Sequence, residues 1–112
     1  MPFKFPIGIY KVTDESMMPQ FKPGGYVIIN RWFSWLAVGD VVVLRHPARE
    51  MLIIKRISKI DGNMITVLGD STAFSEDSRQ FGPVDRSLVV GKVFRFYEPE
   101  RNVEKEEERI GE

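Results

Sequence analysis

The sequence predicts an all-β fold, either a sandwich or a partly closed barrel of short strands. Valine, isoleucine and phenylalanine are abundant and occur in short apolar runs, and these residue types favour strands. Glycine, proline or aspartate bounds the runs, and Asp61-Gly62 in particular is a strong signal for a hairpin turn. Inside the domain no segment is typical of a helix of several turns. Closely spaced strands joined by tight turns are typical of sandwiches and barrels.

The predicted elements form one domain. A turn at residues 23–25 (Pro-Gly-Gly) precedes the first strand. Residues 1–10 are apolar but contain two prolines, a lysine and a glycine, and they lack the arrangement of a cleavable secretion signal. We expect a single β domain over residues 1–97 and a nearly all-charged tail over residues 98–112, which forms a frayed helix or stays disordered. The predicted strands are residues 26–30, 40–44, 52–60, 64–68 and 88–97.

The composition excludes several classes of function. The 112 residues suffice for one modest core. With 16 basic and 16 acidic residues the formal net charge is zero, so there is no electrostatic case for a nucleic-acid partner. The lack of cysteine excludes disulfides and cysteine nucleophiles, and a single histidine makes a histidine-based metal cluster implausible. No cofactor is expected, and no apolar run approaches the roughly 18–20 residues that span a bilayer.

An aromatic run at residues 32–36 interrupts the strand pattern. It places Trp32, Phe33 and Trp35 in what should be a connection between two strands. Tryptophan favours membrane interfaces, so these three residues can form a peripheral membrane contact. The run can equally well cap the core, and both interpretations stay open.

Ser16 is a candidate nucleophile, although a serine in a loop is usually only a turn or capping residue. Its hydroxyl needs a base, because the proton is held far too tightly at neutral pH. The only histidine, His46, precedes a proline at the end of a predicted strand, and a surface turn histidine is the favoured interpretation. A lysine can replace histidine as the base if burial lowers its pKa by several units.

Lys55 fits that role. Strand alternation puts Ile53, Lys55 and Ile57 on one face, so apolar β-branched side chains flank the lysine, while Arg56 points to the other face. The alternative is a lysine at a sheet edge, where its charge blocks aggregation. Downstream, residues 69–83 form a polar loop with an Asp–Arg pair at positions 77 and 79, and loops of this kind often carry function.

Together these segments resemble the type I signal peptidase family and its short relatives that mature other proteins. That family has a Ser-Met-x-Pro nucleophile box, a Pro-Gly-Asp turn, a Gly-Asp-Val-Val strand start, a Lys-Arg-Ile/Val base box, and a last box of Gly-Asp-Asn followed by Ser-x-Asp-Ser-Arg. Each box alone is weak, but their order and spacing are specific. The matching segments are residues 16–19 (Ser-Met-Met-Pro), 23–25 (Pro-Gly-Gly), 39–42 (Gly-Asp-Val-Val), 55–57 (Lys-Arg-Ile), 69–71 (Gly-Asp-Ser) and 75–79 (Ser-Glu-Asp-Ser-Arg).

The resemblance implies a signal-peptidase/LexA-like barrel and a serine endopeptidase with a Ser–Lys dyad. Ser16 would attack the scissile carbonyl, and a neutral Lys55 would take the serine proton and return it to the leaving amine. The backbone N–H of Ser16 would supply one donor to the oxyanion. The implied supporting residues are Ser75, which hydrogen-bonds the lysine amine, Asp77 and Arg79, which pair to hold their loop, and Met17, which lines the substrate pocket or covers the dyad.

The implied substrate is a polypeptide, a signal or leader segment bound in extended form along a sheet edge and cut after small residues. The protein would be membrane-associated if it processes signal peptides and cytoplasmic otherwise. Four departures from the family matter. Asp14 stands where relatives have Gly or Ser, and an ionised carboxylate there would repel a developing oxyanion. Gly25 replaces the usual Asp and Ser71 the usual Asn, and the N-terminal membrane anchor is not seen.

Two other interpretations stay open. A self-cleaving domain of the LexA type shares the Ser-Met and Lys boxes, but it lacks the Ser-x-Asp-Ser-Arg loop and accompanies a DNA-binding domain that this chain does not show. A catalytically inactive module of the same fold would only bind peptides or a partner. The substitution at Asp14 and the unseen anchor favour that module, which predicts a charged Lys55 and no turnover.

Overall fold

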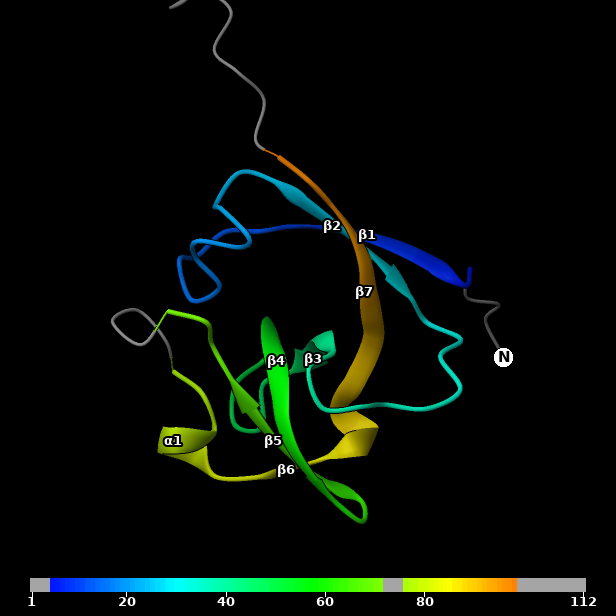
Figure 1. Ribbon diagram of the computed structural model, residues 1–112, viewed down its shortest axis with the longest axis vertical. Helices are drawn as coiled ribbons and strands as arrows, with labels where there is room; N and C mark the ends of the chain where they lie inside the picture. Colours follow the sequence, from blue (N-terminus) through cyan, green and yellow to red (C-terminus); the bar gives the residue numbers. More distant parts are fainter. Residues whose placement is uncertain (1–4, 72–75, 99–112) are drawn as a thin grey trace, which may run out of the picture.

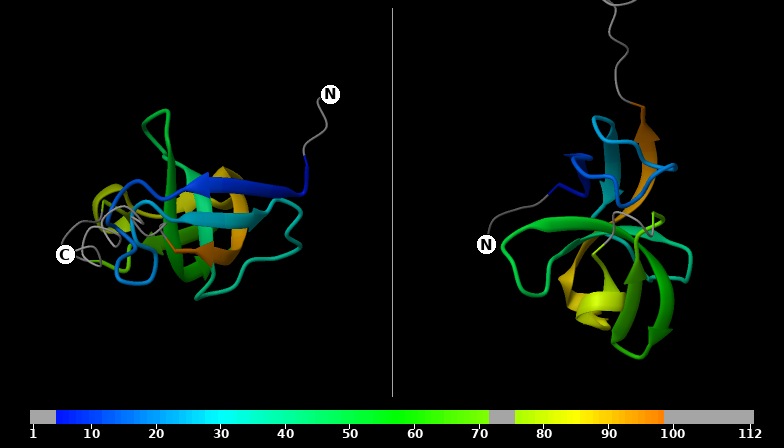
Figure 2. Two further views of the ribbon diagram at one scale, coloured as in Figure 1. Left: turned by 90° about the horizontal axis from the view of Figure 1, so that it is seen from above. Right: turned by 90° about the vertical axis from the view of Figure 1, so that its left-hand side faces the viewer.

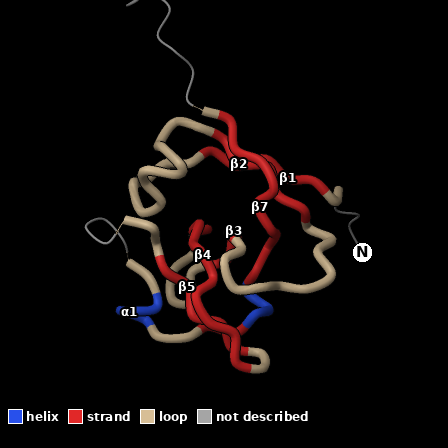
Figure 3. The backbone as a smooth tube through the Cα atoms, viewed as in Figure 1, coloured by secondary structure: helices blue, strands red, loops and turns tan. Residues whose placement is uncertain are grey.

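The computed structural model describes residues 5–71 and 76–98, and nearly all of its regular structure is strand (Figures 1 and 3). The all-β prediction is confirmed. The one α-helix of the described residues, α1, has four residues. The elements in chain order are β1 (Ile7–Lys11), β2 (Tyr26–Asn30), β3 (Val41–Arg45), β4 (Leu52–Asp61), β5 (Met64–Leu68), α1 (Ser78–Phe81), β6 (Val84–Asp85), the 3-10 helix η1 (Arg86–Leu88) and β7 (Val89–Tyr97).

The seven strands form one antiparallel sheet in the order β1-β2-β7-β3-β4-β5-β6. Strand β7 joins its two halves, because its last residues pair with β2 and its first residues pair with β3. The register shifts between Ile28 and Ile29 and again between Val43 and Leu44, and such bulges increase the local bend and twist of a sheet. The sheet therefore curls, with β1, β2 and the end of β7 on one side and β3 to β6 on the other (Figure 2).

Strands β3 and β4 lie between two hydrophobic cores, because their alternate side chains point to opposite faces. The first core is packed between β3, β4, β5, β6 and β7, and the second lies below β1 and β2. The first core contains Val42, Leu44, Ile53, Ile57, Ile65, Val67, Val84 and Val89. The second contains Val12, Met17, Val27, Ile29, Val41, Val43 and Ile54.

The five predicted strands are all present, with bounds that differ by at most one residue. The Asp-Gly hairpin is also confirmed, since Asp61 pairs with Met64 and Gly62 takes a φ of +60° in the two-residue turn between them. Two short strands, β1 and β6, were not predicted. Strand β1 follows Pro6 and contains Gly8, both of which weaken a strand signal. None of the helices in the described residues is long and apolar enough to cross a membrane.

Candidate active site

Ser16 lies in the loop between β1 and β2, and this loop is closed at its base by the backbone. Val12 donates to Gly25 O (2.8 Å) and Gly24 donates back to Val12 O (2.8 Å). Inside the loop, Phe21 N donates to Met17 O (2.9 Å). Met17 is fully buried in the second core and fixes the loop against the sheet. The peptide bond before Pro19, the proline of the Ser-Met-x-Pro box, is cis.

The hydrogen bonds of Ser16 connect it to two neighbouring segments. Its carbonyl oxygen accepts from Ser71 N (2.8 Å), so the loop that contains Ser16 lies against the loop that follows β5. Its backbone N–H and its hydroxyl both donate to Oδ1 of Asp14, over 3.1 and 2.9 Å. Asp14 therefore points at Ser16 rather than away from it. Ser16 itself is only 2% exposed.

Lys55 lies on β4, directly opposite Val42 of β3. Since opposite residues of an antiparallel pair share a face, its side chain leaves the sheet on the side of the first core, together with Ile53 and Ile57. The predicted alternation is therefore confirmed. Lys55 is 2% exposed, which argues against the surface-edge interpretation.

Burial lowers the pKa of Lys55 from its ordinary value, because desolvation disfavours the ammonium form. Three carboxylates oppose this effect, and among them Asp14 acts most strongly, followed by Asp77 and Glu76. The carboxylate that holds Ser16 is thus also the one that interacts most strongly with Lys55. Asp14 therefore links Ser16, which it holds by two hydrogen bonds, to the electrostatic surroundings of Lys55.

Asp77 and Arg79 organise the start of α1. Asp77 is fully buried and caps the helix, and its carboxylate accepts from Arg79 N (3.0 Å), Arg79 Nε (2.9 Å) and Arg79 Nη2. The same carboxylate accepts from Gly69 N (2.8 Å), so it connects both ends of the loop over residues 69–77. The pairing implied by the resemblance is present. Ser75, the residue expected to orient the lysine, lies outside the described residues.

Arg56 points to the face opposite Lys55, as predicted, but it belongs to the site indirectly. Its Nε and Nη2 donate to the two oxygens of Asp70 over 2.9 Å each, and its Nη1 donates to Gly39 O (2.9 Å). Asp70 N in turn donates to the sulfur of Met17 (3.4 Å). Arg56 thus supports the loop that contacts Ser16. The sequence placed Arg56 on the correct face but did not show this partner, which depends on the tertiary fold.

His46 is buried, so the surface-histidine interpretation is wrong. Its Nδ1 accepts from the backbone N–H groups of Ala48 (3.0 Å) and Arg49 (3.1 Å), which leaves Nε2 to donate to Glu76 (3.0 Å). The ring also packs edge-on against Phe81, with 5.3 Å between the ring centroids. These contacts attach the end of β3 to the residue before Asp77. His46 is therefore placed to hold the loop rather than to act as a base for Ser16.

A narrow cavity lies next to the site. It has a volume of about 80 Å³ and lies between residues 10–14 and residues 52–54, with Val27 and Val43 at its base. Two strand edges border it. Among the described residues, strand β1 pairs with β2 only. Strand β4 pairs with β5 only from Arg56 onward, so residues 52–55 of β4 have no strand partner among the described residues on the side that faces β5. An extended chain could add to either edge.

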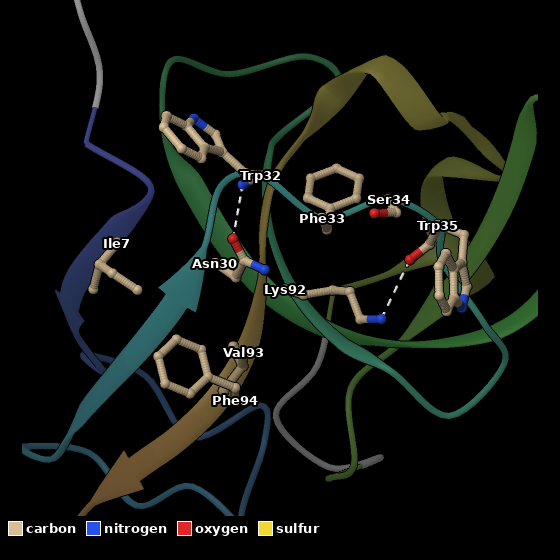
Figure 4. Close-up of a pocket in the computed structure, with 9 residues that line it drawn as sticks. All are labelled: Ile7, Asn30, Trp32, Phe33, Ser34, Trp35, Lys92, Val93 and Phe94. Atoms are coloured by element: carbon tan, nitrogen blue, oxygen red, sulfur yellow. Dashed lines mark hydrogen bonds between the residues drawn. The ribbon is translucent and has the colours of Figure 1, made fainter.

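The aromatic run lies at the other end of β2 and is divided between core and surface. Phe33 and Leu36 pack against the first core. Trp32 and Trp35 are 62% and 69% exposed and stand on two sides of a groove of about 530 Å³ (Figure 4). Lys92 donates to Trp35 O (3.2 Å) and pairs with Asp40 (3.1 Å) beside this groove. The core-capping interpretation thus holds for Phe33 and Leu36, while a membrane contact through Trp32 and Trp35 stays a prediction. The described residues contain no group of three or more acidic or histidine side chains that could hold a metal ion.

Comparison with known proteins agrees with the motifs. The family model described as signal peptidase, peptidase S26, matches residues 1–67 and 58–97. The chain belongs to the signal peptidase family. It is 30% identical over 125 residues to the mitochondrial ATP-independent inner membrane protease subunit 1a of Arabidopsis thaliana, covering 87% of this chain and 74% of that protein.

Two relatives from Schizosaccharomyces pombe are similar to the chain as well. Mitochondrial inner membrane protease subunit 1 is 32% identical over 109 residues, which covers 76% of this chain and 69% of that protein. Subunit 2 is 27% identical over 118 residues, covering 83% of this chain and 66% of that protein. The chain thus spans about two thirds to three quarters of the length of these relatives. Membership of a protease family is shown, and the chemistry and substrates of this chain are proposals.

Proposed function

We propose that the protein is a serine endopeptidase of the signal peptidase type, with Ser16 as nucleophile and Lys55 as general base. The observation that carries this proposal is the burial of a lysine amine on an apolar face, in the same site as a buried serine. Burial lowers the pKa of Lys55, and a neutral amine is what a base at moderate pH requires.

The reaction would proceed in two halves. Ser16 Oγ attacks the scissile carbonyl carbon, its proton passes to the Lys55 amine, and the Ser16 N–H stabilises the oxyanion. The lysine then returns the proton to the leaving amine as the peptide bond breaks, which leaves an acyl-serine. Water then hydrolyses this ester, with Lys55 again acting as the general base. The predicted role of Ser75 is to orient the lysine amine, and the Asp77–Arg79 pair would hold the loop that carries it.

We expect the substrate to be a signal or leader segment bound in extended form. Residues 52–54 of β4 have no strand partner on the β5 side among the described residues, and this edge leads directly to Lys55, which supports pairing with such a segment. The cavity of about 80 Å³ between that edge and residues 10–14 admits only small side chains, which supports cleavage after small residues. Met17 is fully buried in the second core and is not among the residues that line this cavity, so its predicted role is to cover the dyad.

We also propose that the protein works at a membrane surface. Its relatives are named as inner membrane proteases. The exposed indoles of Trp32 and Trp35, with Ile7 and Phe94 on the other wall of the groove, form the apolar surface that an interfacial contact needs. Phe33 lies between these two tryptophans in the chain and packs against the first core.

An inactive peptide-binding module is the second candidate, and the contact between Asp14 and Ser16 favours it. The two candidates separate in one experiment. A peptide with Ala-x-Ala before the scissile bond is incubated with the wild type, Ser16→Ala and Lys55→Ala, and the products are identified by mass spectrometry. Cleavage by the wild type alone supports the protease. Binding of the peptide without cleavage by any of the three proteins supports the module.

A further inference from the structure

Asp14 holds both hydrogens of Ser16 that peptide cleavage would use. One carboxylate oxygen, Oδ1, accepts the backbone N–H over 3.1 Å and the hydroxyl over 2.9 Å. The N–H is the donor expected to stabilise the oxyanion, and the hydroxyl proton is the one that Lys55 has to accept. In this arrangement the serine can neither stabilise an oxyanion nor give its proton to the lysine.

The charge of Asp14 adds to this block. An oxyanion that developed at the Ser16 N–H would lie beside an ionised carboxylate, and like charges at such short range repel. Ser16 is buried, whereas the Asp14 side chain is exposed and has open solvent to move into. Asp14 also lines the narrow cavity next to residues 52–54 of β4. A peptide chain in this cavity would therefore lie against the residue whose carboxylate holds Ser16.

We propose that Asp14 is a lock on the nucleophile, which opens when the scissile carbonyl oxygen of a bound polypeptide replaces the carboxylate at the Ser16 N–H. The inference rests on the proposed function and adds a regulatory step to it. The protein at rest is blocked, and only a peptide that fills the cavity displaces the carboxylate. Asp14 is in this sense a positioning residue that acts through Ser16.

The same displacement would prepare the base. Burial lowers the pKa of Lys55, and Asp14 is the carboxylate that opposes this effect most strongly. Asp77 and Glu76 also raise the pKa of Lys55, and Arg79 lowers it, but these three groups belong to the loop and helix behind the lysine. When Asp14 moves into solvent, Lys55 loses its strongest opposing charge and becomes neutral more readily.

The test compares kcat/KM for an Ala-x-Ala peptide across pH 6 to 10 in Asp14→Gly, Asp14→Asn and the wild type. The control is Glu15→Gln, which removes the neighbouring exposed carboxylate. We expect Asp14→Gly to raise kcat/KM at pH 7 by at least about tenfold, the scale of one hydrogen bond to a charged group. Asp14→Asn, which keeps an acceptor but no charge, should gain less. Both variants should move the alkaline rise of the profile to lower pH, while Glu15→Gln stays within about twofold of the wild type.

A second readout follows the contact itself without turnover. The amide proton of Ser16, observed by NMR, should have a different chemical shift in the wild type and in Asp14→Asn in the free protein. A peptide aldehyde adds to Ser16 Oγ, so that the carbonyl oxygen becomes the oxyanion and the serine proton passes to Lys55. In that adduct the Ser16 amide should no longer respond to Asp14, because the oxyanion has taken its place.

Different experimental results would contradict the Asp14 lock and the proposed protease function. Cleavage by the wild type that is unchanged or lost in Asp14→Gly overturns the lock alone, as does an aldehyde adduct in which the Ser16 amide still differs between the wild type and Asp14→Asn. If no variant cleaves the peptide and the aldehyde does not add to any of them, the proposed function is overturned, and the lock is overturned with it.

Discussion

Lys55 and Val42 lie directly opposite each other on β4 and β3, and Val42 is completely buried. The register of this pair leaves a lysine where the sheet would otherwise carry a valine or an isoleucine. Burying an ammonium group is unfavourable, so the position costs stability that only a function would preserve.

Lys55→Met should therefore give a folded protein that is more stable than the wild type by about 1 kcal/mol at pH 7. The folded-state pKa of Lys55 is lowered, so the unfolded chain binds more protons between that pKa and about 10.4. Wild-type stability should rise with pH in this window, and the advantage of Lys55→Met should shrink there. Urea unfolding at pH 7 and 10 measures this, with exposed Lys59→Met as the matched control. A Lys55→Met protein less stable than the wild type at pH 7 would contradict the account.

Arg56, the residue after Lys55, should contribute much less to activity than Lys55. Its two-bond pair with Asp70 supports the loop that contacts Ser16, but it lies on the opposite face from Lys55. Arg56→Ala should lower kcat/KM by about tenfold, far less than Lys55→Ala, because it loosens the loop without removing a reacting group. Asp70→Ala should have a similar effect, and the double variant should add little to either. Independent, additive losses would show that the pair does not act as a unit.

The contact between His46 and Glu76 should make loop stability depend on pH. The hydrogen bond from His46 holds the pKa of Glu76 below its ordinary value, and Arg49 acts in the same direction. A lowered carboxyl pKa contributes stability above the unfolded value of about 4.3, and this contribution is lost as pH falls through the folded value. Glu76→Gln should thus lower Tm at pH 7, with a difference that narrows below pH 4. A difference in Tm between the wild type and Glu76→Gln that stays constant across this range would mean that the Glu76 charge does not stabilise the loop.

The groove between Trp32 and Trp35 should bind to phospholipid membranes. Trp32→Ser together with Trp35→Ser should reduce co-sedimentation with vesicles of neutral and anionic phospholipids and leave the thermal unfolding unchanged, because both side chains are exposed. Tyr26→Ser, an exposed aromatic at the other end of β2, is the control. Undiminished binding by the double tryptophan variant would refute the membrane contact, and a loss of self-association instead would assign the groove to a protein partner.

The features that could be predicted from the sequence are those that depend on local interactions. The two-residue period of β4 was enough to place Lys55 with Ile53 and Ile57, because alternation does not depend on the rest of the fold. The hairpin after Asp61 was equally local. Strand β1 was missed because its pairing with β2, rather than its own composition, makes it a strand.

The unexpected parts of the site depend on loop conformation and on distant segments. The sequence showed that Asp14 departs from the family, but only the loop geometry shows that its carboxylate holds Ser16. Gly25 replaces the usual Asp, and a Cβ at this position would lie 2.5 Å from Tyr97 O, so here β7 leaves no room for a side chain. The partner of His46 lies 30 residues away and could not be predicted from its neighbours.

The most direct test of the central claim is to measure the titration of Lys55 itself. Lysines labelled with ¹³C at Cε are followed by NMR from pH 6 to 11, with Lys55→Met identifying the resonance, and kcat/KM for the Ala-x-Ala peptide is measured over the same range. The account predicts that Lys55 titrates below about 10.4 and that activity rises with the same pKa. A Lys55 that titrates at the ordinary value, or activity that does not follow its titration, would contradict the Ser16–Lys55 mechanism.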